Sequence, residues 1–253
     1  MDTSLMNTTQ SSSPAGHYVS FITSQELRRA GETLVKEVAR GNWKQQQLLI
    51  EVIRRFDEEV GKAIVLDGIT AMGLTGGAER FVSSVLATVS ATTDKVSKQV
   101  IPKLNEKQMQ IAADHVRSLS LYSVEADGSK VPRTGFIVPN EIEQLRLTIT
   151  CEVRAGNWQG QRDNAAKLLS AIGDQLLAEV YLKSIKAMGL GFFADKIIQG
   201  GAGIARVLQH KLIDWAIGTM GEEQFNRAVD FMETRTLHLS EAQTHHYFFY
   251  PNN

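Results

Sequence analysis

The chain has 253 residues, with 27 Lys or Arg against 28 Asp or Glu and a formal net charge of −1. Hydrophobic residues make up 43% and charged residues 22%, which is typical of globular proteins and excludes collagen-like or proline-rich chains. The charge balance argues against a nucleic-acid coat protein, and a single cysteine, Cys151, excludes an internal disulfide and favours a reducing compartment.

Residues 1–17 form a polar segment rich in Ser and Thr. They lack the basic start and apolar centre of a secretory signal, so we expect a disordered tail. Nowhere do 18 consecutive apolar residues occur, and the sequence therefore predicts no transmembrane segment. These features favour a cytoplasmic location.

The two halves of the chain are similar. Glu37–Trp43 reads EVARGNW and Glu152–Trp158 reads EVRAGNW, while AMGL occurs at Ala71–Leu74 and again at Ala187–Leu190. With one single-residue shift after the tryptophan, residues 21–122 align with the second half and give 24 identities in 102 positions. Residue frequencies would give roughly six by chance.

We interpret this similarity as the tandem duplication of a unit of about 105 residues, an ordinary domain size. The predicted divisions are a first unit at residues 18–124, a polar linker at 125–132, a second unit at 133–240 and a C-terminal tail at 241–253.

Each unit shows helical periodicity. Leu27, Leu34 and Val38 share one face of a first helix, for which Thr23-x-x-Glu26 is a predicted capping box. In the second unit, Pro139 is predicted at the first helical position. A second helix follows the tryptophan, with Leu49, Val52 and Phe56 facing inward. A third is expected over residues 78–101, ended by Pro102, and a fourth opens at Asn105 with Gln108 three residues on.

Short alternating segments flank the helices and are candidate strands that pair with one another, namely Val19–Ile22 with Ser118–Val124 and Gly135–Val138 with Thr234–Leu239. The predicted fold class is all-α, a tandem duplication of a roughly four-helix unit, with room for two short strand pairs.

Repeated glycines mark the predicted turns. Gly41 and Gly156 would end the first helices, and Gly73 and Gly189 the second helices, each in the left-handed conformation that a Cβ disfavours. Asn42 is expected to cap the second helix. The stretch at residues 200–203, GGAG, is interpreted as close helix packing or a kink, since no phosphate-loop pattern occurs.

Acidic residues shared by both units have no capping explanation. Glu37 and Glu152 lie near helix C-termini, where an acid is unfavourable, and Asp114 aligns with Asp230. We expect a Lys or Arg partner on a neighbouring helix, and a functional carboxylate in each unit is the alternative. Cys151 is expected to be a buried small residue rather than a nucleophile.

The tail contains four consecutive aromatic residues, Tyr247, Phe248, Phe249 and Tyr250. They are expected to fold back onto the helices, or alternatively to dock on a partner protein. The sequence contains neither HExxH nor GxSxG, so no catalytic residue, metal site or cofactor is predicted.

The leading functional hypothesis is a non-enzymatic cytosolic accessory or interaction protein, whose partner is another protein. One alternative is an enzyme or small-ligand-binding protein with its site between the two units, using Glu37, Glu152, Asp114 or Asp230. Another is a DNA-binding regulator using the arginines at 28, 29, 54 and 55. The third helices are expected to meet at an interface between the units and to be the most buried helices. Oligomeric state is left open.

Overall fold

The computed structural model describes residues 15–74, 78–125, 127–190 and 192–239, most of which are helical. The first half contains β1 (Gly16–Ile22), α1 (Gln25–Ala39), α2 (Gln46–Val60), η1 (Gly61–Leu66), α3 (Asp67–Ala71), α4 (Ala78–Val100), η2 (Ile101–Lys103), α5 (Glu106–Ser118) and β2 (Ser120–Val124). The second half contains β3 (Lys130–Val138), α6 (Asn140–Arg154), η3 (Gln159–Gln161), α7 (Arg162–Leu176), η4 (Leu177–Leu182), α8 (Lys183–Met188), α9 (Phe192–Thr219), α10 (Glu222–Arg235) and β4 (Thr236–Leu239).

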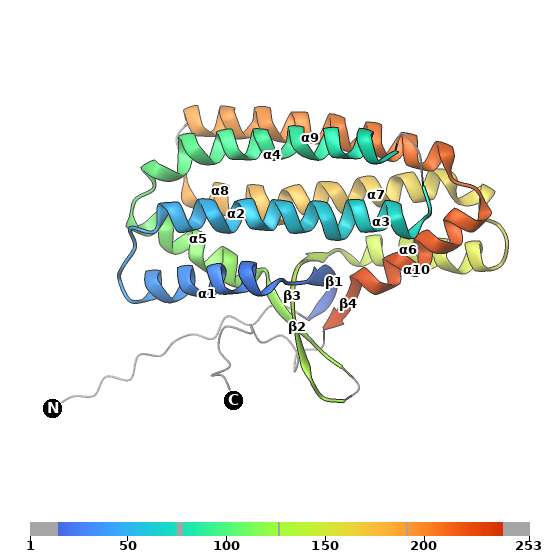
Figure 1. The fold of residues 1–253 in the computed structure, drawn as a ribbon, viewed down its shortest axis with the longest axis horizontal. Coiled ribbons are helices and arrows are strands. Elements are labelled where there is room, and N and C mark those ends of the chain that lie inside the picture. Colours follow the sequence, from blue (N-terminus) through green and yellow to red (C-terminus); the bar gives the residue numbers. More distant parts are fainter. Residues whose placement is uncertain (1–14, 75–77, 126, 191, 240–253) are drawn as a thin grey trace.

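The helices form layers (Figure 1). The long helices α4 and α9 pack side by side as an outer layer, with α2 beneath α4 and α7 beneath α9. The shorter α1, α5, α6 and α10 lie on the other side of α2 and α7, next to the sheet. Buried side chains from both halves form one shared hydrophobic core, so each half completes its core with residues of the other.

The described residues are mostly helical, as predicted, but the short strands form one sheet rather than two separate pairs. The four strands of the sheet are antiparallel in the order β2-β3-β1-β4, and Val19 of β1 lies opposite Phe136 of β3 at the centre. The predicted strand segments are confirmed in place, but the outer strands are exchanged between halves. β2 pairs with β3 of the second half, and β4 pairs with β1 of the first half. The sequence pattern predicts which residues alternate and carries no information on which strand lies next to which.

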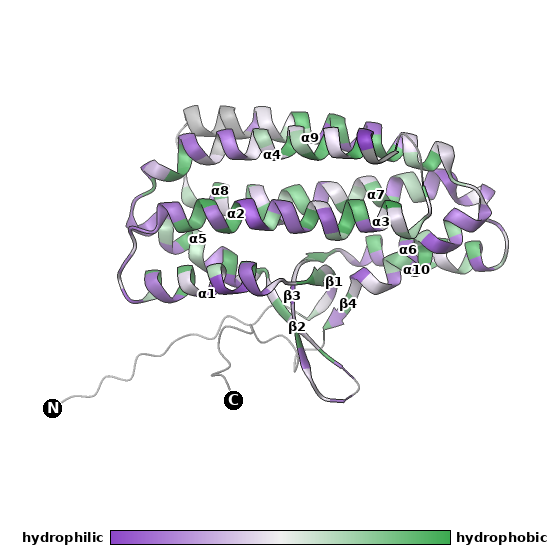
Figure 2. Cartoon of the chain, viewed as in Figure 1, coloured by the Kyte–Doolittle hydropathy of each residue, from purple (hydrophilic) through white to green (hydrophobic). Residues whose placement is uncertain are grey.

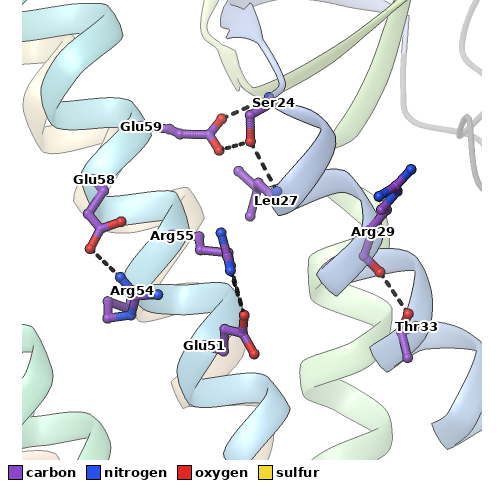
Figure 3. Close-up of polar contacts among 9 residues, drawn as sticks. All are labelled: Ser24, Leu27, Arg29, Thr33, Glu51, Arg54, Arg55, Glu58 and Glu59. Atoms are coloured by element: carbon purple, nitrogen blue, oxygen red, sulfur yellow. Dashed lines mark hydrogen bonds and ion pairs between the residues drawn. The ribbon is translucent and has the colours of Figure 1, made fainter.

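The start of α1 differs from the predicted capping box. Ser24, rather than Thr23, is the N-cap, and its hydroxyl accepts a hydrogen bond from the Leu27 amide at 3.1 Å. Figure 3 shows that the same hydroxyl also donates to Glu59 of α2. Thr23 instead bonds to the Thr134 hydroxyl at 2.8 Å, because it lies at the end of β1 beside β3.

The start of α5 is as predicted. The side chain of Asn105 accepts from the Gln108 amide, and the Gln108 side chain accepts from the Asn105 amide, both at 3.0 Å. At the corresponding position of the second half, Gln224 accepts from the Gly221 amide at 3.0 Å. In both helices, a glutamine side chain therefore satisfies a free amide at the N-terminus.

The predicted glycine turns are confirmed. The φ angles are +85° at Gly41, +87° at Gly156, +68° at Gly73 and +58° at Gly189. The expected role of Asn42 is wrong, since α2 begins at Gln46 without a side-chain cap and the Asn42 side-chain amide donates to Glu37 instead.

Both second helices contain a π-helical segment, η1 at Gly61–Leu66 and η4 at Leu177–Leu182. The periodicity predicted one continuous α-helix at each place. A π-turn inserts one residue, which shifts the following side chains around the helix axis and weakens the normal backbone ladder. Tertiary packing therefore decides the geometry at these two points.

The third helices meet, as α4 and α9, but the prediction that they are the most buried is wrong. They form the outer layer, and Ile204 and Val207 of α9 are 47% and 56% exposed. Figure 2 shows that α9 carries hydrophobic residues over much of its described length. The expected close packing at residues 200–203 is also wrong at its outer glycines, because a Cβ at Gly200 or Gly203 would meet nothing. Both of these glycines are exposed.

Cys151 and the turn within the predicted linker both lie at the surface. Cys151 is exposed rather than buried, so the expectation of a buried thiol is wrong. In the predicted linker, Asp127–Ser129 form an exposed turn, while residues 130–132 already belong to β3. The Ser129 amide donates to the Asp127 carboxylate at 2.8 Å, which closes the turn.

Candidate functional site

A cavity of about 680 Å³ lies between the outer helix layer and the helices beneath it. Its walls come from both halves, chiefly from α2, α4, α7 and α9, and α5, α8 and the two central strands contribute further residues. Most of the lining is apolar, as at Val52, Val85, Ile172, Ala202 and Ile213. These are the inward faces of amphipathic helices, so the same pattern that builds the core also builds the cavity.

A small polar cluster interrupts this apolar wall. The Tyr181 hydroxyl of η4 donates a hydrogen bond to the Asp57 carboxyl of α2, and Thr93 of α4 provides a second side-chain hydrogen bond to Asp57. All three residues line the cavity. The cluster therefore joins three helices, one of them from the other half of the chain.

The environment of Asp57 shifts its acidity. Burial raises the pKa of Asp57 to about 6, and the hydrogen bonds from Tyr181 and Thr93 only partly oppose that effect. The pKa of Tyr181 is raised well above its usual value, by burial and by the neighbouring Asp57. Tyr181 is therefore a neutral donor at physiological pH, and Asp57 is a carboxyl that changes charge close to it.

His115 of α5 is a further polar group that lines the cavity. Its Nε2 lies 2.8 Å from the carbonyl oxygen of Val180 in η4, so that nitrogen is the protonated donor. Burial lowers the pKa of His115, which favours the neutral ring. His115 thus satisfies a carbonyl of the π-turn that places Tyr181.

The other π-segment is secured in a similar way. Arg235 of α10 donates through Nε to the carbonyl oxygen of Ala63 in η1 at 3.0 Å. Its guanidinium lies over the Phe231 ring, 4.7 Å from the centroid. Each π-turn is therefore held by a side chain from the opposite half, and π-turns are frequent at functional sites.

The polar cluster has no counterpart at the aligned positions of the two halves. In the alignment of the two halves, Asp57 corresponds to Gly173, and Thr93 corresponds to Gln209. Gln209 donates to the Ser170 carbonyl at 3.0 Å and fills the space beside Gly173, where a Cβ would lie 2.3 Å from it. Tyr181 likewise corresponds to Val65. The cluster therefore provides an acid and two hydroxyls, whereas the aligned positions carry a neutral amide, a glycine and a valine.

The acids singled out from the sequence lie elsewhere. Glu37 accepts from Asn42 at 2.9 Å and pairs with Arg40 at 3.1 Å, and Glu152 accepts from Asn157 at 2.8 Å. The hydrogen bond from Asn42 is the main cause that holds the pKa of Glu37 below its usual value. Each glutamate thus has an asparagine partner in the following turn, and the cation beside Glu37 lies on its own helix rather than on a neighbouring one.

The other shared acids are also near the surface. Asp114 pairs with Arg117 on its own helix, and Asp230 lies 3.2 Å from Arg154 of α6. Neither these two nor the glutamates line the cavity. The aromatic residues Tyr247, Phe248, Phe249 and Tyr250 fall outside the described residues.

The arginines of α2 that were proposed for DNA contact are balanced by acids. Arg54 pairs with Glu58, and Arg55 donates to Glu51 at 2.9 Å, both within α2 (Figure 3). Such i, i+4 pairs are typical of a solvated helix face. The structure gives this alternative no added support.

Sequence reasoning missed Asp57, Thr93 and Tyr181. A signal for Asp57 exists, because it directly follows Phe56 and precedes Val60 by three residues, on the flank of the apolar face of α2. An acid at such a position needs a buried partner. Its partner is 124 positions away, so only the folded chain identifies it.

Within residues 15–74, 78–125, 127–190 and 192–239, no group of three His, Cys, Asp or Glu side chains is placed to hold a metal ion. No helix in that part of the chain is both long and apolar enough to cross a bilayer. Comparisons with protein-family models, curated proteins and solved structures found no match.

Proposed function

We propose that this protein is a non-enzymatic binding protein that holds an apolar small molecule in the cavity between its two halves. The observation that carries the proposal is the cavity itself, at about 680 Å³. Ligand sites typically span roughly 300–1,000 Å³ and combine apolar walls with a few placed polar groups. The cluster of Asp57, Thr93 and Tyr181 supplies such groups.

Energetics support an occupied cavity. Apolar walls that face no partner atoms lose the dispersion contacts that a ligand would restore. Water is a poor occupant, because each buried water needs two to four polar partners and most of this lining is apolar. An apolar ligand removes the void and keeps the walls dry.

Duplication of an ancestral unit forms part of the proposal. Matching glycine turns, matching π-segments and matching starts of α5 and α10 occur in the two halves. Fusion of two such units encloses a cavity at their junction. A cytoplasmic location and docking of a partner protein at residues 247–250 remain proposals that rest on the sequence.

An enzyme is the second candidate. A carboxyl with a pKa of about 6 is suited to general acid–base chemistry, and Asp57 lines the cavity. The two candidates differ in outcome, since a binding protein releases its ligand unchanged after incubation whereas an enzyme releases a product.

The test is binding of the neutral apolar dye N-phenyl-1-naphthylamine, followed by its fluorescence, with native mass spectrometry of the purified protein. Ala202→Phe places a large side chain in the cavity wall, and Ala91→Phe makes the same change at an exposed site on the neighbouring helix. We expect Ala202→Phe to weaken dye binding at least about tenfold and Ala91→Phe to leave it unchanged. Absence of binding to the wild type, or equal binding by all three folded proteins, would contradict the proposal.

A further inference from the structure

The polar cluster carries a negative charge when Asp57 is ionised. Two other charged residues lie along the lining, but Glu58 is exposed and paired with Arg54, and Lys62 is exposed. Among the described lining residues there is no arginine. Asp57 is therefore the acid of the lining that is withdrawn from solvent, and no cation among the described residues is paired with it.

The partners of Asp57 leave acceptor capacity unused. An ionised carboxylate has about four acceptor positions, and Tyr181 and Thr93 supply two neutral hydroxyl donors. His115 does not balance the charge, because its protonated nitrogen faces the Val180 carbonyl and burial favours its neutral form. A further donor that carries a positive charge would complete the site.

We propose that the ligand is an amphiphilic amine whose ammonium group pairs with Asp57 and whose apolar body lies along the cavity. This inference rests on the proposed function and names its ligand class. A fatty acid is disfavoured, since its carboxylate would lie beside Asp57 with no cation to offset the repulsion. A long-chain alcohol can donate a hydrogen bond but would leave the charge of Asp57 unpaired.

The asymmetry of the cavity gives the ligand an orientation. Val65, Gly173 and Gln209 occupy the positions that correspond to Tyr181, Asp57 and Thr93 in the alignment of the two halves. Gln209 is already bonded to the Ser170 carbonyl. A ligand with a single amine and one apolar body matches this arrangement, because the aligned positions provide no second acid.

The test compares three probes of equal chain length, dodecylamine, dodecan-1-ol and dodecanoate, as competitors of the bound dye below their aggregation concentrations at pH 7.5. We expect dodecylamine to bind at least about tenfold more tightly than the alcohol, and dodecanoate to bind most weakly. In Asp57→Asn the preference should be lost, so that dodecylamine and dodecan-1-ol bind about equally tightly. Asp94→Asn removes a partly exposed acid of α4 that pairs with Lys98 and does not line the cavity, and it should keep the preference.

Tyr181→Phe provides a second variant in case Asp57→Asn does not fold. It keeps the carboxyl and removes only one neutral donor, so the preference for the amine should persist. Equal binding of the three probes to the wild type, or a preference that survives in folded Asp57→Asn, would overturn the amine assignment while leaving the cavity proposal intact. Failure of the dye itself to bind would instead contradict the proposed function.

Discussion

The hydroxyl of Tyr181 donates a hydrogen bond to the carboxyl of Asp57, and these two residues lie 124 positions apart in the sequence. The bond links α2 of the first half to η4 of the second half across the cavity. The Phe56 ring packs against Tyr181 edge-on, with centroids 6.2 Å apart, so apolar contact supports the polar one. This link is a point where the stability of the fold and the chemistry of the cavity depend on the same side chains.

The acidity of Asp57 predicts a pH-dependent stability. Its pKa is about 6 in the folded protein against an ordinary value of 3.8, so folding favours the protonated form. That stabilisation is complete below about pH 4 and is lost as the pH rises through about 6, by up to about 3 kcal/mol. The free energy of unfolding of Asp57→Asn, relative to that of the wild type, should therefore increase between about pH 4 and pH 7. Denaturant titrations of both proteins across this range measure the difference, and a constant difference would contradict the prediction.

A glycine-to-alanine substitution should have opposite effects on the free energy of unfolding at two sites. Gly41→Ala should lower the free energy of unfolding by about 1 kcal/mol, because φ is +85° there even though a Cβ would meet nothing. Gly203→Ala lies within α9, where a Cβ also meets nothing, and it should raise stability by roughly 0.5–1 kcal/mol. Thermal or denaturant unfolding distinguishes the two, and equal shifts would mean that backbone conformation is not the cause.

Substitution of the first residue of α7 should lower the free energy of unfolding more than substitution of the first residue of α2. Arg162 donates to the carbonyl oxygens of Ile217 and Met220, each at 2.6 Å, whereas Gln46 makes one bond to the Leu104 carbonyl at 3.2 Å. Arg162→Ala should destabilise by about 2–3 kcal/mol and Gln46→Ala by about 1 kcal/mol. Arg162→Lys should restore little, because an ammonium lacks the planar fork that reaches both carbonyls. Chemical denaturation measures the loss of stability in each variant. A larger loss for Gln46→Ala than for Arg162→Ala would show that these hydrogen bonds do not determine the difference.

We expect Glu37 and Asn42, in the turn after α1, to be energetically coupled. The Asn42 side chain donates to the Glu37 carboxylate at 2.9 Å, and the backbone amide of Asn42 donates to the Glu37 carbonyl at 3.0 Å. Asn42→Ala should cost about 1 kcal/mol, and in a double-mutant cycle with Glu37→Ala the two losses should not add. Strictly additive losses would show that the side-chain bond contributes nothing. The pair Glu152 and Asn157 offers the same cycle as a replicate.

The sequence by itself determined part of the local structure. The apolar spacing, the start of α5 at Asn105 and the end of α4 before Pro102 all follow from interactions within a few residues. The four positive-φ glycines follow for the same reason, since a left-handed helix end is a local demand on one residue.

Only the tertiary structure decided how these elements meet. Contacts between residues far apart in the chain determine three features: the exchange of strands between the halves, the outer position of α4 and α9, and the π-turns. The cavity and its polar cluster belong to the same class, because Asp57 and Tyr181 become neighbours only when α2 and η4 face each other. Sequence periodicity shows which face of a helix is buried, and long-range packing determines what that face is buried against.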